Sequence, residues 1–178
     1  PVEAELVDSN FVKVGTQLSA LECIRFGTTM VNDMYFFPES TAEVLDQVGM
    51  RAIVGKPFLD FVMPDEKHLG VNPIPGRAQR FDDFHAKYAK SPRIQTAIAA
   101  HAPYTCNDDT LRQVLALSQE YDVPIHMHVC ETRSEVDESI KKYGKRPIKR
   151  LSDLGLLSEN FFAAHMIHVD EEEAKIFY

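Results

Sequence analysis

The chain contains 178 residues, 44% hydrophobic and 26% charged, a balance that supplies a core and excludes global disorder. A formal net charge of −8 excludes broad binding to nucleic-acid phosphates, which requires clustered Lys and Arg, and no apolar run approaches the roughly 18 residues of a membrane span. Three widely spaced cysteines, Cys23, Cys106 and Cys130, favour reduced thiols in a cytoplasmic protein, and no secretory signal precedes the first predicted helix.

Helices and strands alternate through the first half of the chain. The helical spacing of Phe11, Val14, Leu18 and Leu21 predicts the first helix. The predicted elements are a helix over residues 10–26, a strand over 28–33, a helix over 41–48 and a short strand over 51–54. The prolines and glycines of residues 59–80 then predict a long loop, broken at most by a short helix, and loops of this length are often lids or binding loops.

The second half of the chain carries clear capping signals. Asn107 can cap a helix whose first turn contains acidic residues, and Thr132 and Glu135 have the spacing of a capping box. Gly144 supplies a helix stop, and Pro147 suits the first turn of the next helix. The predicted elements are strands over residues 95–101, 124–129 and 161–165 and helices after Asn107, Thr132, Pro147 and Asp170.

The alternation of apolar strands with helices predicts a parallel sheet covered by helices. Candidate strands begin near residues 28, 51, 95, 125 and 162. Eight strand–helix units need on the order of 250 residues, so about five units form part of a (β/α)8 TIM barrel or a smaller open sheet. The predicted fold class is therefore α/β, with residues 1–178 as a single partial catalytic barrel domain truncated at both ends.

Histidines stand at the ends of three of these strands. His101 and His165 each end an apolar run, and His126 and His128 project to the same side of their strand because residues i and i+2 do so. Glu131 falls three residues after His128, where the strand should give way to a loop. Barrels of this kind carry their chemistry at the C-terminal ends of the strands. The pattern therefore indicates a metal site or a proton-transfer site.

Four ordered motifs carry a resemblance to a known family. They are residues 28–36 (TTMVNDMYF), 101–105 (HAPYT), 126–132 (HMHVCET) and 163–168 (AAHMIH). Together they resemble the amidohydrolase superfamily, and within it the branch of 5-methylthioadenosine/S-adenosylhomocysteine deaminases. The resemblance implies a metal-dependent hydrolase that acts on C–N bonds other than peptide bonds, by hydrolytic deamination of an adenosine-type purine nucleoside. It also implies Zn²⁺ or another divalent metal as the cofactor of the complete protein.

The resemblance implies a role for each matching residue. His128 would be the metal-binding histidine at the end of the fifth barrel strand. Glu131 would be the acid/base that takes a proton from metal-bound water and passes it to a ring nitrogen of the substrate. His165 would hydrogen-bond the attacking hydroxide close to the metal. His101 would bind the substrate base, and Glu3 would hold ribose hydroxyls.

Zinc suits these residue types, because it accepts imidazole and carboxylate ligands and lowers the pKa of bound water to about 7. The resemblance places the family's two-histidine motif before residue 1 and its eighth-strand aspartate after residue 178. His128 is then the one metal ligand that can be assigned, and we expect the 178 residues alone to be inactive or nearly so, with weak or absent metal binding. Near Lys56 the family often carries an arginine that faces a homocysteine carboxylate. Lysine can supply the charge but lacks the planar guanidinium that binds a carboxylate through two hydrogen bonds.

Structural roles compete with these functional ones. His126 lies one layer deeper than His128 and suits the core or a supporting role, and His168 suits the surface or a loop. Glu131 can instead be only a loop carboxylate at the start of a helix. His101 can be a strand-end histidine that bonds the turn after it.

Three functions remain open from the sequence. The preferred one is a fragment of a zinc-dependent adenosine-type deaminase, whose partner is a small-molecule purine nucleoside and neither nucleic acid nor membrane. The second is another amidohydrolase, such as a guanine deaminase or a triazine chlorohydrolase. The third is an inactive truncated barrel whose exposed edges, near Thr28 and Phe162, pair with another copy to form a homo-oligomer.

Overall fold

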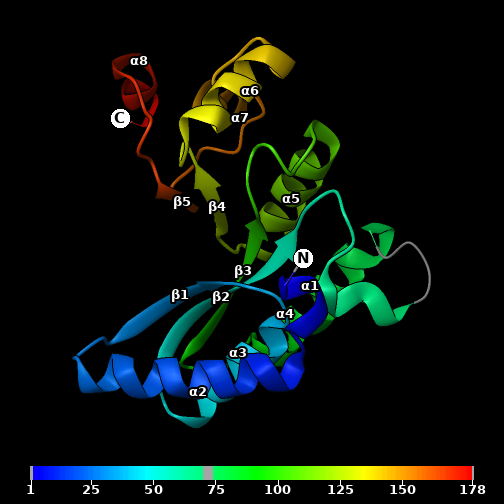
Figure 1. The fold of residues 1–178 in the computed structure, drawn as a ribbon, viewed down its shortest axis with the longest axis vertical. Helices are drawn as coiled ribbons and strands as arrows, with labels where there is room; N and C mark the ends of the chain where they lie inside the picture. Colours follow the sequence, from blue (N-terminus) through cyan, green and yellow to red (C-terminus); the bar gives the residue numbers. More distant parts are fainter. Residues whose placement is uncertain (1, 70–73, 178) are drawn as a thin grey trace. The chain divides into compact units, whose positions relative to one another are not determined.

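The computed structural model describes residues 2–69 and 74–177, and it divides into two compact units (Figure 1). The N-terminal unit comprises residues 1–57 and 61–97, and the C-terminal unit comprises residues 58–60 and 98–178. One strand, β3 (Ile94–Ala100), contributes its first four residues to the N-terminal unit and its last three to the C-terminal unit. Each unit is described separately below.

The N-terminal unit alternates helices and strands as predicted. Its elements are α1 (Val2–Leu6), α2 (Ser9–Arg25), β1 (Met30–Met34), α3 (Pro38–Gln47), β2 (Arg51–Phe58), the 3-10 helices η1 (Pro64–Leu69) and η2 (Ile74–Gly76), and α4 (Arg77–Tyr88). β1 and β2 pair in parallel, with Met30 opposite Arg51 and Met34 opposite Gly55. β2 is longer than the predicted strand, and α3 begins earlier than predicted because Pro38 occupies its first turn.

The core of the N-terminal unit lies between its helices and its strands. The buried residues that form it are Ala20, Ala42, Leu45, Met50, Ala52, Val54, Phe84, Tyr88 and Ile94. α2 and α3 lie side by side (Figure 1), and α2 buries Val12 and Ala20. The apolar stripe that predicted α2 does not form its buried face, since Phe11, Val14, Leu18 and Leu21 are each more than half exposed. Periodicity thus located the helix and did not tell which of its faces is buried.

The segment predicted as a loop, residues 59–80, contains the short helices η1 and η2 and ends in the first turn of α4, a helix of twelve residues that the prediction did not include. α4 begins directly after Gly76, and its buried residues Phe81, Phe84 and Tyr88 recur at helical spacing. A buried ion pair ties the rest of the segment to this helix, because Arg77 donates to Glu66 at 2.7 and 2.6 Å and both side chains are almost fully buried. The ion pair therefore fixes η1 against the first turn of α4, within a segment predicted as a loop with at most a short helix.

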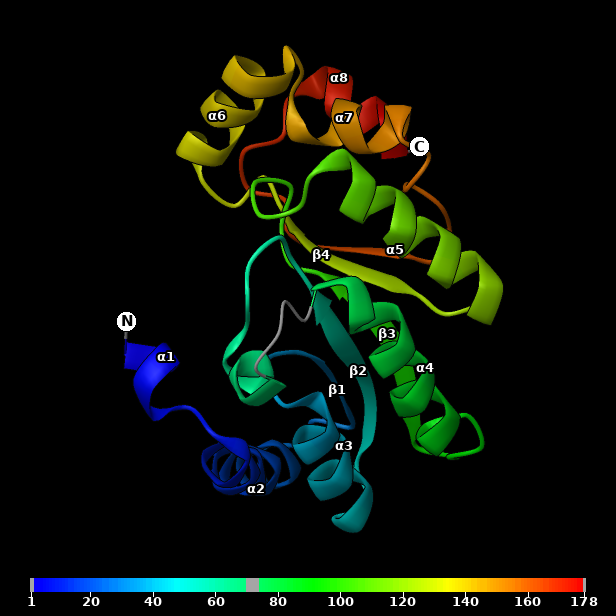
Figure 2. The same cartoon turned by 90° about the vertical axis from the view of Figure 1, so that its right-hand side faces the viewer.

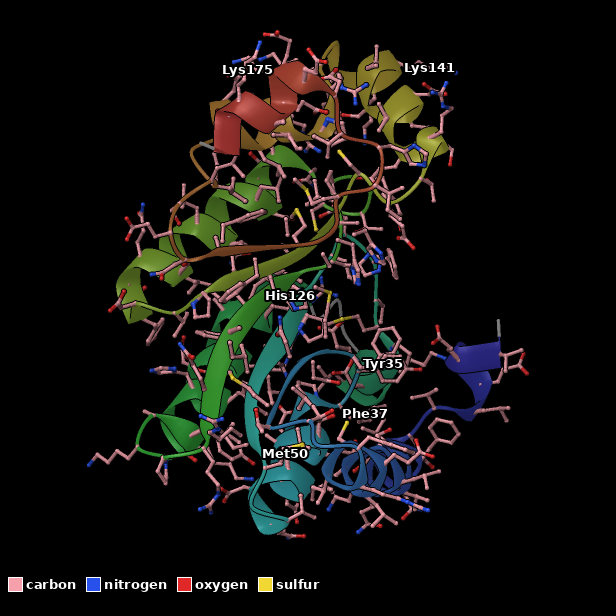
Figure 3. All side chains as sticks on the ribbon, turned by 90° about the vertical axis from the view of Figure 1, so that its left-hand side faces the viewer. Tyr35, Phe37, Met50, His126, Lys141 and Lys175 are labelled. Atoms are coloured by element: carbon pink, nitrogen blue, oxygen red, sulfur yellow. The ribbon has the colours of Figure 1, made fainter. Side chains whose placement is uncertain are left out.

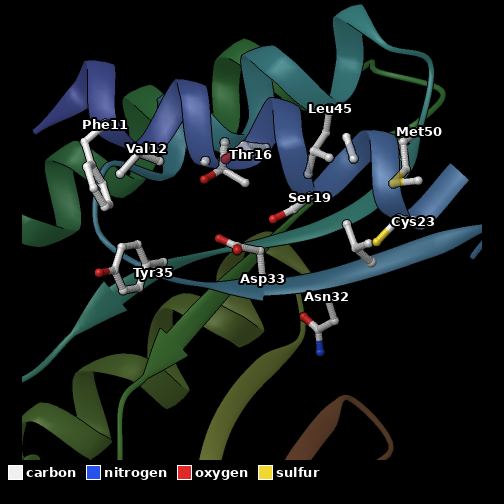
Figure 4. A pocket seen from close by; sticks show the side chains of 14 residues that line it. Phe11, Val12, Thr16, Ser19, Cys23, Asn32, Asp33, Tyr35, Leu45 and Met50 are labelled. Carbon is white, nitrogen blue, oxygen red and sulfur yellow. The ribbon is translucent and has the colours of Figure 1, made fainter. Parts of the chain in front are cut away.

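A cavity of about 280 Å³ lies between α2 and β1 within the N-terminal unit (Figure 4). The side chain of Asp33 points into it, opposite Thr16 and Ser19 of α2 (Figure 4). Asp33 Oδ2 is buried and has no hydrogen-bond partner among the residues that the structure describes. Burial raises the pKa of this carboxyl group to about 6.

Replacement of Asp33 by Asn is expected to stabilise the protein at pH 7 by about 1–2 kcal/mol, a figure reduced for the partial exposure of the side chain. The pKa of Asp33 is higher in the folded state than in the unfolded state. Between about pH 4 and pH 6, Asp33 is therefore ionised in the unfolded state while it still holds its proton in the folded state. The destabilisation by Asp33 therefore develops across that window and is fully present above it.

Urea unfolding of Asp33→Asn at pH 4 and pH 7, in the complete gene product that carries these residues, measures this effect. The matched control is Asp137→Asn, which removes an exposed carboxylate from α6 (Arg133–Tyr143). A gain in unfolding free energy that is larger at pH 7 than at pH 4 is the expected result. An equal gain at both pH values, or a loss at pH 7, would contradict the assignment.

The C-terminal unit contains the remaining parallel strands and their helices. After β3 its elements are α5 (Asp108–Tyr121), β4 (Ile125–Val129), α6 (Arg133–Tyr143), α7 (Pro147–Asp153), β5 (Phe161–His165), α8 (Glu171–Ala174) and the 3-10 helix η3 (Lys175–Phe177). β3 and β4 pair in parallel with Ile98 opposite Ile125, and β4 and β5 pair in parallel with Val129 opposite His165. α5 lies beside β4 (Figure 2).

Asn107 and Thr132 are confirmed as N-cap residues in this unit. Asn107 accepts from the N–H groups of Asp109 and Thr110, and Thr132 accepts from the N–H of Glu135. Gly144 ends α6 in the left-handed conformation that glycine tolerates. Within residues 2–69 and 74–177, no helix has the length and apolar character needed to cross a membrane.

Arg150 of α7 fastens the loop that follows β3. Its buried guanidinium donates to the backbone carbonyl of Pro103 at 2.7 Å and to that of Cys106 at 2.9 Å. It also forms an ion pair with Asp108 at 2.7 Å, and its Cζ lies 3.7 Å from the centre of the Tyr143 ring. These contacts hold the loop next to His101 in a defined position.

Candidate functional site

Three of the predicted histidines meet at one edge of the C-terminal unit. His101 directly follows β3, His128 lies in β4 and His165 ends β5, so all three stand near the C-terminal ends of parallel strands. The ring centres of His101 and His128 are 5.1 Å apart, and those of His128 and His165 are 5.2 Å apart. The imidazoles that the sequence pattern singled out are therefore neighbours in space.

The orientation of the His128 ring is fixed by the backbone. Its Nδ1 lies 2.8 Å from the carbonyl oxygen of His101, and the same oxygen accepts from the backbone N–H of His128 at 3.0 Å. A carbonyl can only accept, so Nδ1 carries the proton and Nε2 keeps its lone pair. Histidines that ligate metals are commonly held by such a bond from the other ring nitrogen. His128 therefore has the tautomer that a metal ligand requires.

Glu131 lies in the loop after β4 and faces His165. The Glu131 Oε1 atom is 3.7 Å from His165 Nε2, and both side chains are partly exposed. His165 has a φ of 72°, Met166 a φ of 55° and Cys130 a φ of 53°. Left-handed conformations of such residues cost of order 1–3 kcal/mol each and cluster at functional sites. The backbone around the carboxylate and the imidazole is thus strained in both of the segments that carry them.

His101 is held by the turn that follows it. Its Nδ1 lies 2.9 Å from Thr105 Oγ1, and that hydroxyl donates to the carbonyl of Ala102 at 3.1 Å. The hydroxyl therefore accepts from the Nδ1–H of His101, which leaves Nε2 as an acceptor. Burial lowers the pKa of His101 and His128 lowers it further, while Glu131 opposes both effects. The His101 ring is therefore neutral, and its Nε2 can accept a hydrogen bond from a ligand.

His126 is buried beside His128, as the i and i+2 spacing predicts. Its side chain is labelled in Figure 3, it is 8% exposed, and its ring centre lies 6.1 Å from that of His128. Burial, followed by the proximity of His128, lowers the pKa of His126 to about 4, so the ring is neutral. Its Nδ1 has no hydrogen-bond partner in the described part of the chain. This deep position agrees with the predicted core or supporting role.

Glu3 belongs to the N-terminal unit, whereas the four histidines described above belong to the C-terminal unit. Tyr35, labelled in Figure 3, donates to Glu3 Oε1 at 2.7 Å, and the hydrogen bond joins α1 to the loop after β1. In the same unit the ammonium group of Lys56 is buried and lies 2.5 Å from Glu39 Oε1. The charge of Lys56 is therefore satisfied by a neighbouring carboxylate.

The described residues fit part of a metal site. His128 offers a free Nε2, and His165 and Glu131 lie beside it. Across residues 2–69 and 74–177, no group of three or more His, Cys, Asp or Glu side chains is arranged to hold a metal ion. Catalytic zinc sites use three protein ligands and an open position, so further ligands would be needed beside His128.

Several residues that support the site were not assigned roles from the sequence. Thr105 and Arg150 act through bonds to a histidine ring and to loop carbonyls, and Glu135 binds the loop that carries Glu131. Only Glu135 had a local signal, its spacing from Thr132, and that signal pointed to a helix cap. The bonds of the other two residues depend on tertiary contacts that no spacing in the sequence reveals.

Parallel strands with covering helices, carrying imidazoles and a carboxylate at their C-terminal ends, define a segment of an α/β barrel of the metal-dependent hydrolase type. The sequence model of the Amidohydrolase family matches residues 1–177, and the chain belongs to that family.

Relatives with assigned activities are similar over almost the whole chain. A 5-methylthioadenosine/S-adenosylhomocysteine deaminase of Thermodesulfovibrio yellowstonii is 40% identical over 176 residues, which are 99% of this chain and 39% of the relative. A 5'-deoxyadenosine deaminase of Methanopyrus kandleri is 34% identical over 180 residues, 99% of this chain and 39% of the relative. The chain thus spans about two fifths of the length of these relatives.

Solved structures confirm the predicted fold class, part of a (β/α)8 barrel. The structure of an adenosine deaminase from Xanthomonas campestris with bound zinc matches with a TM-score of 0.93 and 39% identity, covering 99% of this chain and 39% of that one. A guanine deaminase from C. acetobutylicum with bound guanine matches with a TM-score of 0.81 and 24% identity, covering 98% of this chain and 43% of that one. At that identity the second likeness supports the fold alone.

Proposed function

We propose that the complete gene product carrying this chain is a zinc-dependent hydrolase that deaminates an adenosine-type purine nucleoside. The observation that carries this proposal is the meeting of His101, His128, Glu131 and His165 at one strand edge. The similarity to deaminases of 5-methylthioadenosine, S-adenosylhomocysteine and 5'-deoxyadenosine supports the substrate class.

His128 would hold the metal through Nε2, because its Nδ1 is already committed to the His101 carbonyl. The remaining ligands would come from outside the described set of residues. Bound zinc would act as a Lewis acid that makes water nucleophilic near neutral pH. The fixed tautomer of His128 supports this assignment, since a ligand that needs no reorientation binds a metal more tightly.

Glu131 would move the proton in the reaction. Its carboxylate would accept a proton from the attacking water and deliver it to a ring nitrogen next to the carbon under attack. A new C–O bond forms at that carbon. The proton left on the new hydroxyl then passes to the exocyclic amino group, the carbonyl forms, the C–N bond breaks, and ammonia leaves. His165, 3.7 Å from Glu131, would hydrogen-bond the attacking oxygen and keep it in line.

His101 and Glu3 would bind the substrate. The free Nε2 of His101 would contact the base, and the carboxylate of Glu3 would accept from ribose hydroxyls. Lys56 is buried against Glu39, so its charge is compensated before any ligand arrives. No contact between Lys56 and the substrate is therefore proposed.

Ammonia release by the zinc-loaded complete gene product tests the proposal. The substrates to compare are 5-methylthioadenosine, S-adenosylhomocysteine, adenosine, guanine and a chlorotriazine, with chloride release measured for the last. We expect activity with the adenosine-type nucleosides. Activity confined to guanine or to the chlorotriazine would contradict the proposal and favour the alternative amidohydrolase.

A further inference from the structure

The loop between β4 and α6 is held by a buried carboxylate from the start of α6. Glu135 lies in the first turn of α6 and is 3% exposed. Its Oε1 accepts from the backbone N–H of Cys130 at 2.8 Å, and its Oε2 accepts from the backbone N–H of Glu131 at 2.8 Å. Both oxygens thus bind consecutive N–H groups of the loop, in charge-assisted hydrogen bonds.

The same loop is bound on its other side by the turn after β5. The carbonyl of Cys130 accepts from the N–H groups of Ile167 and His168 at 3.1 and 2.9 Å, and the carbonyl of Val129 accepts from the N–H of Met166 at 2.9 Å. Cys130 is therefore fixed through its N–H by Glu135 and through its carbonyl by the turn next to His165. Its φ of 53° is a conformation that such bonds must maintain.

We propose that Glu135 is a positioning residue that fixes the backbone from which the Glu131 side chain projects. The carboxylate of Glu131 is partly exposed and lies 3.7 Å from His165, so its side chain alone is weakly constrained. What holds it is the bond between its own N–H and Glu135. The inference rests on the proposed function, in which Glu131 carries the proton, and it adds a residue that acts on the reaction through Glu131.

This role differs from that of a capping box. A capping-box glutamate bonds the N–H of the cap residue itself, whereas Glu135 accepts from residues one and two positions before the cap, Thr132. The bonds therefore order the loop that carries Glu131 in addition to the start of the helix. A displacement of about 1 Å at a reacting group can lower the rate by about 10²-fold.

Glu135→Gln in the complete gene product tests the proposal. Glutamine keeps the size of the side chain and one acceptor oxygen, but its NH2 group cannot accept from the second N–H. We expect kcat to fall by about 10²-fold while KM changes by less than about threefold and the zinc content stays at the wild-type value. Glu138→Gln, an exposed carboxylate on the same helix, is the matched control and should keep the wild-type kcat.

Amide hydrogen exchange provides a readout that does not depend on activity. Exchange at the amides of Cys130 and Glu131 should be faster in Glu135→Gln than in Glu138→Gln, with the amides of β4 unchanged. Glu135→Asp, which shortens the reach by one methylene and keeps the charge, should recover part of kcat. Wild-type kcat in Glu135→Gln, or a kcat loss that only follows the loss of folded protein, would overturn the inference.

The outcome also separates this inference from the proposed function. If the wild type and Glu138→Gln both fail to release ammonia from any adenosine-type nucleoside, the proposed function is wrong, and the exchange measurement still decides whether Glu135 orders the loop. If both are active and Glu135→Gln equals them in kcat and in exchange, the inference is wrong and the proposed function stands.

Discussion

Replacement of Glu131 by Gln in the complete gene product is expected to lower kcat by about 10²–10⁴-fold, the usual contribution of a positioned acid/base group. Glutamine has nearly the same shape and can still form hydrogen bonds, but it cannot accept and return a proton. KM and zinc content should stay close to the wild-type values, because Glu131 is proposed to move a proton and not to hold the metal. Steady-state ammonia release together with metal analysis measures both quantities.

The geometry makes this a demanding test. Glu131 Oε1 lies 3.7 Å from His165 Nε2, and the loop that carries Glu131 is bound by Glu135 and by the turn after β5. A loss of kcat shared by the control Glu138→Gln would point to a general effect of removing negative charge from this surface. A kcat for Glu131→Gln within about threefold of the wild type would remove Glu131 from the mechanism.

The second large effect is expected for His128→Asn. The amide nitrogen of asparagine can occupy the place of Nδ1 and keep the bond to the His101 carbonyl, while the Nε2 lone pair is deleted. Loss of a residue that merely orients a metal ligand costs about 10–100-fold in metal affinity. Loss of the ligand itself should therefore lower zinc affinity by more than about 100-fold and abolish activity, with little change in the unfolding free energy of the metal-free protein.

Competition with a zinc chelator, followed by equilibrium unfolding, measures these two quantities. His168→Asn is the matched control, since it alters a histidine in the turn after β5 whose backbone carbonyl, and not its ring, accepts from Arg146. Zinc binding by His128→Asn with the wild-type affinity would show that His128 is a packed histidine and not a ligand.

Local signals in the sequence were enough to place the strands and caps of the C-terminal unit. Asn107 and Thr132 accept the hydrogen bonds that their types and positions predict, and Gly144 takes the left-handed conformation that ends α6. The meeting of the strand-end histidines followed from a simple rule, that parallel strands bring their C-terminal ends to one edge. The predicted neighbourhood of His101, His128 and His165 therefore needed no knowledge of long-range contacts.

Features that depend on tertiary contacts were not predicted. α4 was missed because the prolines and glycines before Arg77 outweighed the helical spacing of the aromatic residues after it. The apolar stripe of α2 identified a helix, but the buried face is the one with Val12 and Ala20, which a period alone cannot choose. Glu135 looked like half of a cap, and its reach to the N–H groups of Cys130 and Glu131 depends on the path of the loop.

Zinc-edge anomalous diffraction from crystals of the complete gene product tests the central claim most directly. The account predicts an anomalous peak about 2.0–2.1 Å from His128 Nε2, with the carboxylate of Glu131 within about 3.2 Å of the open coordination position. A zinc peak bound by other residues, with His128 Nε2 free of metal or the carboxylate of Glu131 turned away from it, would contradict the account.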